Sequence, residues 1–142
     1  MRFKNSKVLI TGGASGIGKI MGRMALEKGA ECLVIWDINP QNIALTVSEL
    51  GKYGNVKGYL VDVSRNDLII ESYNKVKVEC GDIDILINCA GIVTSNKTFD
   101  QMSNDEIVRT MSINTLAPMF VTRAMLPGMI AGYLQELMGY DW

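Results

Sequence analysis

Residues 11–18 read Thr11-Gly12-Gly13-Ala14-Ser15-Gly16-Ile17-Gly18, a glycine-rich stretch that decides the fold. A β-branched run at residues 7–11 predicts a strand before it, and apolar residues at helical spacing up to Gly29 predict a helix after it. Glycines at 12, 16 and 18 would let the backbone turn sharply beside a pyrophosphate, which Ser15 and Ile17 would also contact. The helix would direct its free N–H groups at that phosphate. The alternative is a tight turn without a ligand, but the strand–loop–helix context favours a phosphate cradle.

An aspartate closes the next predicted strand, the apolar run at residues 32–36. Asp37 follows Gly18 by 19 positions (37 − 18), close to the roughly 20 expected for a carboxylate that binds an adenosine ribose. Such a carboxylate accepts hydrogen bonds from ribose hydroxyls and repels a 2′-phosphate, so we expect NAD rather than NADP, with Ile38 beside it in the site. One alternative is a solvated turn aspartate, because Asn39 and Pro40 follow. Another is a flavodoxin-like mononucleotide site, but the carboxylate suits a ribose better than a flavin phosphate.

Strand and helix patterns alternate along the rest of the chain. Further strands are predicted at residues 56–61 and 83–87. Helices are predicted after the Asn39-Pro40 pair, after Ser64, which forms a variant of a capping box with Asp67, and after the capping box Ser103–Glu106. Pro118 would kink the long helical stretch that begins there. This order predicts an α/β fold, a Rossmann-type doubly wound parallel sheet with strand order 3-2-1-4. Residues 1–131 are predicted to form this unit, and residues 132–142 an atypical tail that continues the helix.

Composition excludes several classes of function. The 142 residues fit one domain, the net charge is −1, and no run of Lys or Arg suggests nucleic acid or an anionic membrane as a partner. No apolar stretch approaches the roughly 20 residues of a membrane span. Histidine is absent, which removes His-based triads and most zinc sites, so no metal is expected. Cys32, Cys80 and Cys89 are interpreted as ordinary buried thiols in a reducing compartment, and the cytoplasm is the expected location.

Four motifs in order resemble the short-chain dehydrogenases/reductases. Thr11-Gly12-x-x-x-Gly16-x-Gly18 is similar to that family's cofactor loop, and Asp62-Val63 to the pair that holds its adenine ring. Asn88-Cys89-Ala90-Gly91 resembles its Asn-Asn-Ala-Gly motif, which steadies the central sheet beside the cofactor. Asn114 resembles the asparagine whose backbone carbonyl binds a water in its proton relay. Cys89 departs from the family's second asparagine, which puts one side-chain hydrogen bond in doubt.

Each motif also has a simpler interpretation. Asp62 could only precede a helix, Asn88 to Gly91 could be a strand end with a turn, and Asn114 an ordinary polar helix residue. The resemblance, from about Lys7 to Ile130, implies an NAD-dependent oxidoreductase that passes a hydride between the nicotinamide and a small alcohol or carbonyl. In this assignment Asn114 belongs to the catalytic set, and Asn88, Ala90 and Gly91 line the cofactor floor.

The family's catalytic Ser and Tyr-x-x-x-Lys follow its fifth strand, and the resemblance implies that they would lie beyond Trp142. Two Tyr-x-x-x-Lys strings do occur, Tyr53 to Lys57 and Tyr73 to Lys77, but both precede the fourth strand and are attributed to chance. We therefore expect a truncated, inactive chain, by an early stop or a shifted frame after about Ile130. The alternative is a binding-only NAD module or a self-associating pseudoenzyme. A bare fourth strand and an unpaired long helix also predict a homo-oligomer.

Overall fold

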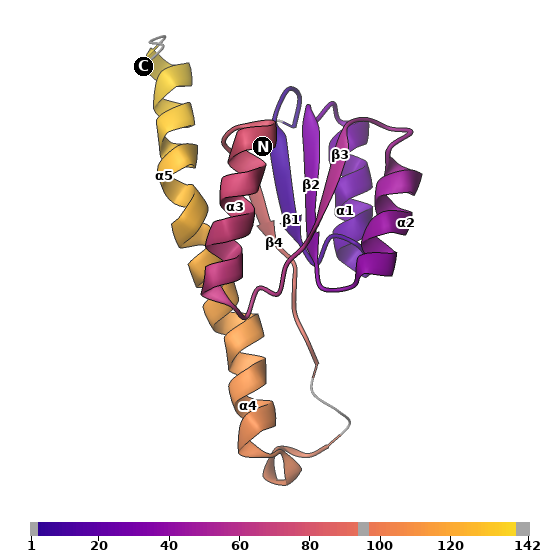
Figure 1. Ribbon diagram of the computed structural model, residues 1–142, viewed down its shortest axis with the longest axis vertical. Coiled ribbons are helices and arrows are strands. Elements are labelled where there is room, and N and C mark those ends of the chain that lie inside the picture. The colour runs from indigo at the N-terminus through magenta and orange to yellow at the C-terminus, as the bar shows by residue number, and fades with distance from the viewer. Residues whose placement is uncertain (1–2, 94–96, 139–142) are drawn as a thin grey trace.

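The computed structural model describes residues 3–93 and 97–138 as one layered α/β unit (Figure 1). Its central sheet has four parallel strands in the order β3-β2-β1-β4, as the sequence predicted. The strands are β1 (Lys7–Thr11), β2 (Cys32–Asp37), β3 (Val56–Leu60) and β4 (Ile85–Asn88). Their carboxyl ends are aligned, because Thr11 of β1 pairs with Trp36 of β2 and with Asn88 of β4. The segments that follow these strands therefore meet at one edge of the sheet.

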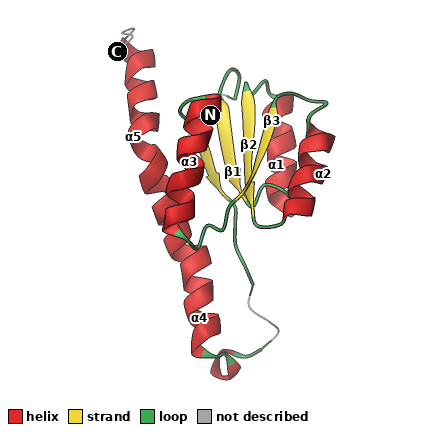
Figure 2. Cartoon of the chain, in the orientation of Figure 1, coloured by secondary structure: helices red, strands yellow, loops and turns green. Residues whose placement is uncertain are grey.

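Helices cover both faces of the sheet (Figure 2). Helices α1 (Gly16–Glu27) and α2 (Pro40–Leu50) lie on one face, and α3 (Asn66–Cys80) and α5 (Ala117–Met138) on the other. Because successive side chains of a strand point to opposite faces, the core consists of two clusters, one on each face of the sheet. In β1, Val8 and Ile10 pack toward α1 and α2, whereas Leu9 packs in the cluster that includes Val76 of α3 and Met125 of α5. No helix in the described part of the chain combines the length and apolarity needed to cross a membrane.

Helix α4 (Asn104–Met111) begins at the predicted capping box. The Ser103 hydroxyl accepts a hydrogen bond from the Glu106 N–H at 3.2 Å, and the Glu106 carboxylate accepts one from the Ser103 N–H at 2.8 Å. The backbone hydrogen bond from Ser103, aided by Lys97, lowers the pKa of Glu106 to about 2. A short 3₁₀ helix, η1 (Phe99–Gln101), precedes this start.

The predicted start of α3 is wrong in one detail. Ser64 does not cap this helix: Arg65 is its N-cap residue, with no side-chain capping bond. The Ser64 N–H and hydroxyl instead donate to Oδ1 of Asp62, at 2.9 and 2.7 Å. The carboxylate two residues earlier offers an acceptor without the helical geometry that a capping box needs. Asn39 does cap α2, where its side chain accepts from the Asn42 N–H.

The helical stretch after α4 also differs from a simple proline kink. A π-helical segment, η2 (Ser112–Leu116), joins α4 to α5, and Pro118 lies in the first turn of α5. The Ala117 N–H bonds to the Ser112 carbonyl, five residues back. Because proline has no N–H, the Asn114 carbonyl lacks its α-helical donor at position 118. Helix α5 runs through residues 131 and 132 to Met138, and the division proposed at that point stays a prediction. Residues 139–142 of the proposed tail lie outside the described residues.

Candidate functional site

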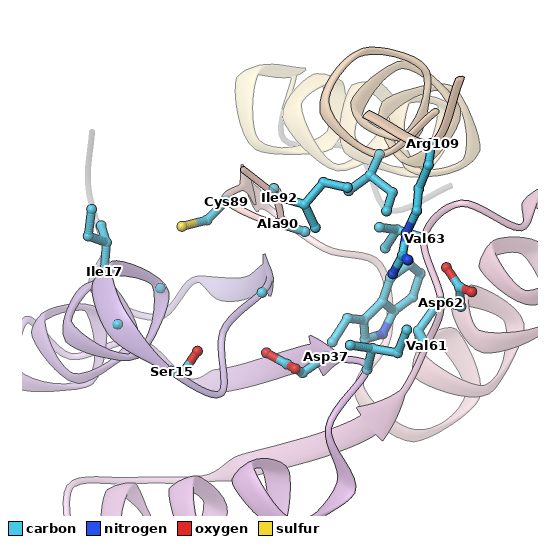
Figure 3. Close-up of a pocket in the computed structure, with 17 residues that line it drawn as sticks. Ser15, Ile17, Asp37, Val61, Asp62, Val63, Cys89, Ala90, Ile92 and Arg109 are labelled. Carbon is cyan, nitrogen blue, oxygen red and sulfur yellow. The ribbon is translucent and has the colours of Figure 1, made fainter. Parts of the chain in front are cut away.

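A cavity of about 390 Å³ lies at the carboxyl edge of the sheet, beside the point where the chain order reverses between β1 and β4 (Figure 3). In open α/β sheets this is where ligands bind. Its walls come from the segments after all four strands and from α4 and η2. The lining residues are Gly12, Ser15, Gly16, Ile17, Gly18, Trp36, Asp37, Ile38, Val61, Asp62, Val63, Cys89, Ala90, Gly91, Ile92, Arg109 and Ile113. Of the residues proposed from sequence, Asn88 and Asn114 alone are absent from this set.

The glycine loop needs its glycines for close backbone approach. Gly12 has φ 66°, and a Cβ there would lie 2.8 Å from the Cα of Ala90. A Cβ on Gly18 would collide with the carbonyl oxygen of Gly12. Gly16 differs, because its φ of 49° favours glycine while the space beside it is open. The loop therefore packs against the segment after β4 on one side and leaves room for a ligand at the start of α1.

The first turn of α1 faces this open space, and neither a capping side chain nor an acidic residue there accepts hydrogen bonds from its N–H groups. Ser15 is the N-cap residue, its side chain makes no capping bond, and the first turn contains no acidic residue. The N–H groups of a first helical turn have no partners within the helix, and with the helix dipole they favour an anion. This end of the cavity suits a phosphate group.

Asp37 makes a turn contact and also lies in the wall of the cavity. One carboxylate oxygen accepts a hydrogen bond from the Asn39 N–H at 3.1 Å, as in a turn. The other accepts from the Ala14 N–H, also at 3.1 Å, and the same carboxylate lines the cavity. The Ala14 carbonyl in turn accepts from the buried hydroxyl of Thr46, at 2.9 Å. The N–H and the carbonyl of Ala14 are therefore both hydrogen-bonded, so the glycine loop is held in shape without a ligand.

Thr11 joins the glycine loop to the segment after β4. Its hydroxyl oxygen accepts hydrogen bonds from the N–H groups of Cys89 and Ala90, each at 3.1 Å, and the residue is only 2% exposed. These two bonds fix the backbone at the motif that begins with Asn88. The Cys89 backbone is thus held, and its side chain lines the cavity as a free thiol.

The two asparagines outside the cavity lining secure its frame. The side chain of Asn88 donates to the Thr122 hydroxyl at 3.2 Å, which ties β4 to α5. The Asn114 amide donates to the Ile92 carbonyl at 2.8 Å and accepts from the Ile92 N–H at 2.9 Å. The Asn114 side chain therefore ties η2 to the segment after β4.

Trp36 and Arg109 are the largest lining residues that sequence reasoning missed. The indole of Trp36 is fully buried, and its Nε1 has no hydrogen-bond partner within residues 3–93 and 97–138. Arg109 extends from α4 toward Val63 and Asp62 (Figure 3). An arginine on a helical face and a tryptophan in an apolar strand carry no sequence signal of a site. Val61, Ile92 and Ile113 were missed for the same reason.

The two Tyr-x-x-x-Lys strings lie away from the cavity. Tyr73 is 8% exposed and donates to the Asp82 carboxylate at 2.9 Å, while Lys77 pairs with the same carboxylate at 3.1 Å. Burial, with this bond to Asp82, raises the pKa of Tyr73 to about 12, far from that of a neutral-pH acid/base. Tyr53 lies under the cations of Arg23 and Lys52. No group of three metal-ligating side chains occurs among the described residues.

Comparison with known proteins gives consistent relatives. Residues 6–134 match the sequence profile described as short chain dehydrogenase. The chain is 37% identical to 17-beta-hydroxysteroid dehydrogenase 13 of Homo sapiens over 124 residues, 87% of this chain and 41% of that protein. It is 33% identical to short-chain dehydrogenase/reductase 3 of Homo sapiens over 129 residues, 90% of this chain and 42% of that protein. The chain thus spans about two fifths of the length of these relatives.

Solved structures agree in fold. A short-chain type dehydrogenase/reductase from Mycobacterium ulcerans superposes with a TM-score of 0.84 at 26% identity, covering 93% of this chain and 49% of that one. An NAD⁺-bound xylitol dehydrogenase superposes with a TM-score of 0.87 at 22% identity, covering 93% of this chain and 51% of that one. The profile covers most of the sequence, so this chain belongs to the short-chain dehydrogenase family.

Proposed function

We propose that this chain binds NAD in the cavity at the carboxyl edge of its sheet. The observation that supports this most is the Asp37 carboxylate, which lies in the cavity wall and hydrogen-bonds to the glycine loop. A carboxylate at this position offers acceptors for the adenosine ribose hydroxyls, with Ile38 beside it. It would repel the 2′-phosphate of NADP, because the two negative charges would lie side by side. NADP is therefore disfavoured.

The other cavity residues can be assigned to separate parts of the cofactor. Gly12, Ser15, Gly16, Ile17 and Gly18 would hold the diphosphate against the first turn of α1. Asp62 and Val63 would contact the adenine, and Ala90 and Gly91 would form the floor. The open space beside Gly16 fits such a group, since nothing lies within 4 Å of a Cβ there, and the close approach of Gly12 to Ala90 holds the loop against the segment after β4. Asn88 would act indirectly, by holding α5 against β4.

The whole protein is proposed to be an oxidoreductase for an alcohol or carbonyl substrate. When bound, the nicotinamide would supply the hydride or accept it. This chain's own contribution to proton movement would be the Asn114 backbone carbonyl, which can accept a hydrogen bond from a water because Pro118 offers no N–H. The family's tyrosine and lysine have no counterpart at the cavity in the described residues, so we propose that the chain by itself binds without turnover. The alternative, a functional binding-only module, makes the same prediction for this chain.

Calorimetric titration of the 142-residue chain with NAD and NADP tests the proposal. We expect NAD to bind more tightly than NADP. Asp37→Asn is expected to weaken NAD binding roughly 10-fold or more, because a hydrogen bond to a charged group contributes about 1.5–3 kcal/mol. Asp37→Asn should also reduce the difference between the affinities for NAD and NADP, since the charge that repels the 2′-phosphate is removed.

Asp84→Asn is the matched control. The Asp84 carboxylate accepts the Lys7 N–H at 2.7 Å, at the opposite end of β1 from the cavity, so NAD affinity should not change. Absence of NAD binding by the unmodified chain, or equal affinity for NADP, would contradict the proposal. Formation of NADH with a panel of alcohols would contradict the expectation that the chain alone does not turn over.

We also propose that copies of this chain associate, and that it works in a reducing, cytoplasmic compartment. β4 is an edge strand, and an unpaired edge readily pairs with another chain. On α5, Met119, Leu126 and Ile130 line an apolar groove and are each exposed by 45% or more. Light scattering is expected to give a mass above 15.6 kDa, and a monomer at high concentration would contradict this. The three free cysteines support the reducing location.

A further inference from the structure

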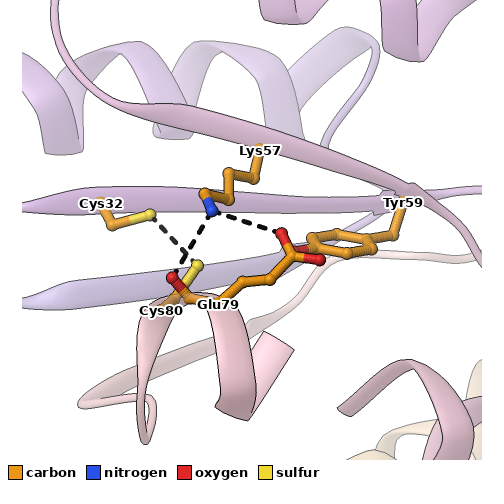
Figure 4. Close-up of polar contacts among 5 residues, drawn as sticks. All are labelled: Cys32, Lys57, Tyr59, Glu79 and Cys80. Carbon is orange, nitrogen blue, oxygen red and sulfur yellow. Dashed lines mark hydrogen bonds and ion pairs between the residues drawn. The ribbon is translucent and has the colours of Figure 1, made fainter. Parts of the chain in front are cut away.

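Two cysteines far apart in the sequence lie in contact at the amino-terminal edge of the sheet (Figure 4). Cys32 is the first residue of β2, and Cys80 is the last residue of α3, 48 positions later. Their Sγ atoms are 3.7 Å apart, and both are free thiols. Cys32 is 3% exposed, whereas Cys80 is half-buried. Asp37 ends the strand that Cys32 begins, so the pair lies at the opposite end of β2 from the cavity.

We propose that Cys32 and Cys80 form a reversible disulfide, made by exchange with a small disulfide such as oxidised glutathione. A disulfide bond is about 2.0 Å long, so the two sulfur atoms need to approach by roughly 1.7 Å. Cys32 is held in the sheet by its pairing with Lys7 of β1, and β3 pairs with β2 from Leu33, the next residue. Cys80 can supply the movement, because it is the last residue of α3 and is followed by Gly81 with φ 84°.

The exposure of the two thiols sets the order of the exchange. The half-buried Cys80, as a thiolate, attacks one sulfur of oxidised glutathione, forming a mixed disulfide and releasing one glutathione thiolate. Cys32 then gives up its proton and attacks the Cys80 sulfur, which expels the second glutathione. The protein dithiol loses two electrons and two protons, and the small disulfide gains both and becomes two thiols. Cys32 suits the second step, because it is buried and already in contact with the sulfur it attacks.

Groups around the pair shift the pKa of Cys32 both upward and downward. Burial, together with the neighbouring Cys80 and Glu31, raises the pKa of Cys32 to about 12, although the Lys57 ammonium acts to lower it. Lys57 lies beside the thiols (Figure 4) and contacts the Glu79 carboxylate at 3.3 Å, and the Tyr59 hydroxyl donates to that carboxylate at 2.8 Å. The Lys57 ammonium thus partly offsets the effect of burial on the Cys32 thiol, whose thiolate the second exchange step needs.

The bond would close a loop from Cys32 to Cys80 that contains β2, α2, β3 and α3. Cross-linking so distant a pair restricts the unfolded chain and should raise the thermal unfolding midpoint by roughly 10 °C. The pair does not line the cavity, so ligand affinity there should change little. This inference does not depend on the proposed cofactor, since the pair and its reaction are separate from the cavity.

Incubation of the native chain in buffers of oxidised and reduced glutathione tests this proposal. Peptide mass spectrometry after alkylation should find Cys32 linked to Cys80, with loss of two hydrogens, while Cys89 stays alkylated. The oxidised form should unfold at the higher temperature, and reduction should reverse the shift. In Cys89→Ser both results should persist, and in Cys80→Ser both should disappear.

Two results on the unmodified chain would overturn the proposal, so the test does not depend on whether a variant folds. One is a glutathione adduct on Cys80 that never proceeds to a Cys32 link. The other is a disulfide that forms only through Cys89. An oxidised form with an unchanged unfolding midpoint would overturn the stabilising role that we assign to the bond.

Discussion

Gly18→Ala is expected to destabilise the protein by about 3 kcal/mol or more and to abolish ligand binding in the cavity. Alanine inside a helix normally stabilises it by about 0.5–1 kcal/mol relative to glycine, so the expected sign is the reverse of the usual one. The cause is the Gly12 carbonyl oxygen, which occupies the place of the new methyl group. The Gly12 carbonyl carbon and the Gly13 Cα would both be only 3.0 Å away. These are backbone atoms, so they cannot rotate aside as a side chain would.

Urea unfolding followed by circular dichroism measures this effect, with NAD calorimetry on the same samples. Gly132→Ala is the control, because Gly132 also lies within a helix, α5, and nothing lies within 4 Å of a Cβ there. It should leave the stability unchanged or raise it by up to about 1 kcal/mol. If both variants were equally stable, the tight contact between the loop and α1 would not exist in solution.

Thr11→Val is expected to cost about 3 kcal/mol, although the two side chains have almost the same shape. Valine removes the oxygen that accepts the N–H groups of Cys89 and Ala90. With only 2% of Thr11 exposed, water cannot easily replace that acceptor. Each buried donor left without a partner costs about 1–3 kcal/mol. Amide hydrogen exchange at residues 89 and 90 should accelerate in the variant more than exchange elsewhere in the sheet.

Thr11→Ser provides the comparison that isolates the hydroxyl. Serine keeps the oxygen and loses one methyl group, which should cost about 1 kcal/mol. Chemical unfolding of the two variants side by side gives the difference that belongs to the two hydrogen bonds. Equal losses of stability in Thr11→Ser and Thr11→Val would mean that packing, rather than hydrogen bonding, joins β1 to the segment after β4.

The sheet order and most of the cavity wall could be predicted because their signals are local. The glycine spacing at residues 11–18 and the distance to Asp37 depend on a single strand–loop–helix unit, and parallel topology then aligns the strand ends. The capping box at Ser103 is equally local and is present. The Ser64 prediction was wrong, since a competing acceptor, Asp62, lies only two residues before it.

The remaining site residues depend on contacts between distant segments. Thr46 reaches Ala14 across 32 positions, and Asn114 reaches Ile92 across 22. The π-helical segment η2 contains Asn114 and ends two residues before Pro118, and neither residue alone indicates a π-helix. Arg109 lines the cavity because of the direction in which α4 leaves the loop before it. Such relations arise from tertiary packing, so spacing along the chain does not reveal them.

The peptide group at Ala14 has a practical consequence for redesign. Protein engineers who wish to exchange one nicotinamide cofactor for the other would begin by replacing the acid at position 37. Here that acid also accepts the Ala14 N–H, so its removal would loosen the loop while changing the preference. A successful exchange would need a second substitution that restores an acceptor for that amide. Under the proposed assignment, the choice of cofactor and the shape of the loop would both depend on Asp37, so a change in one would require a change in the other.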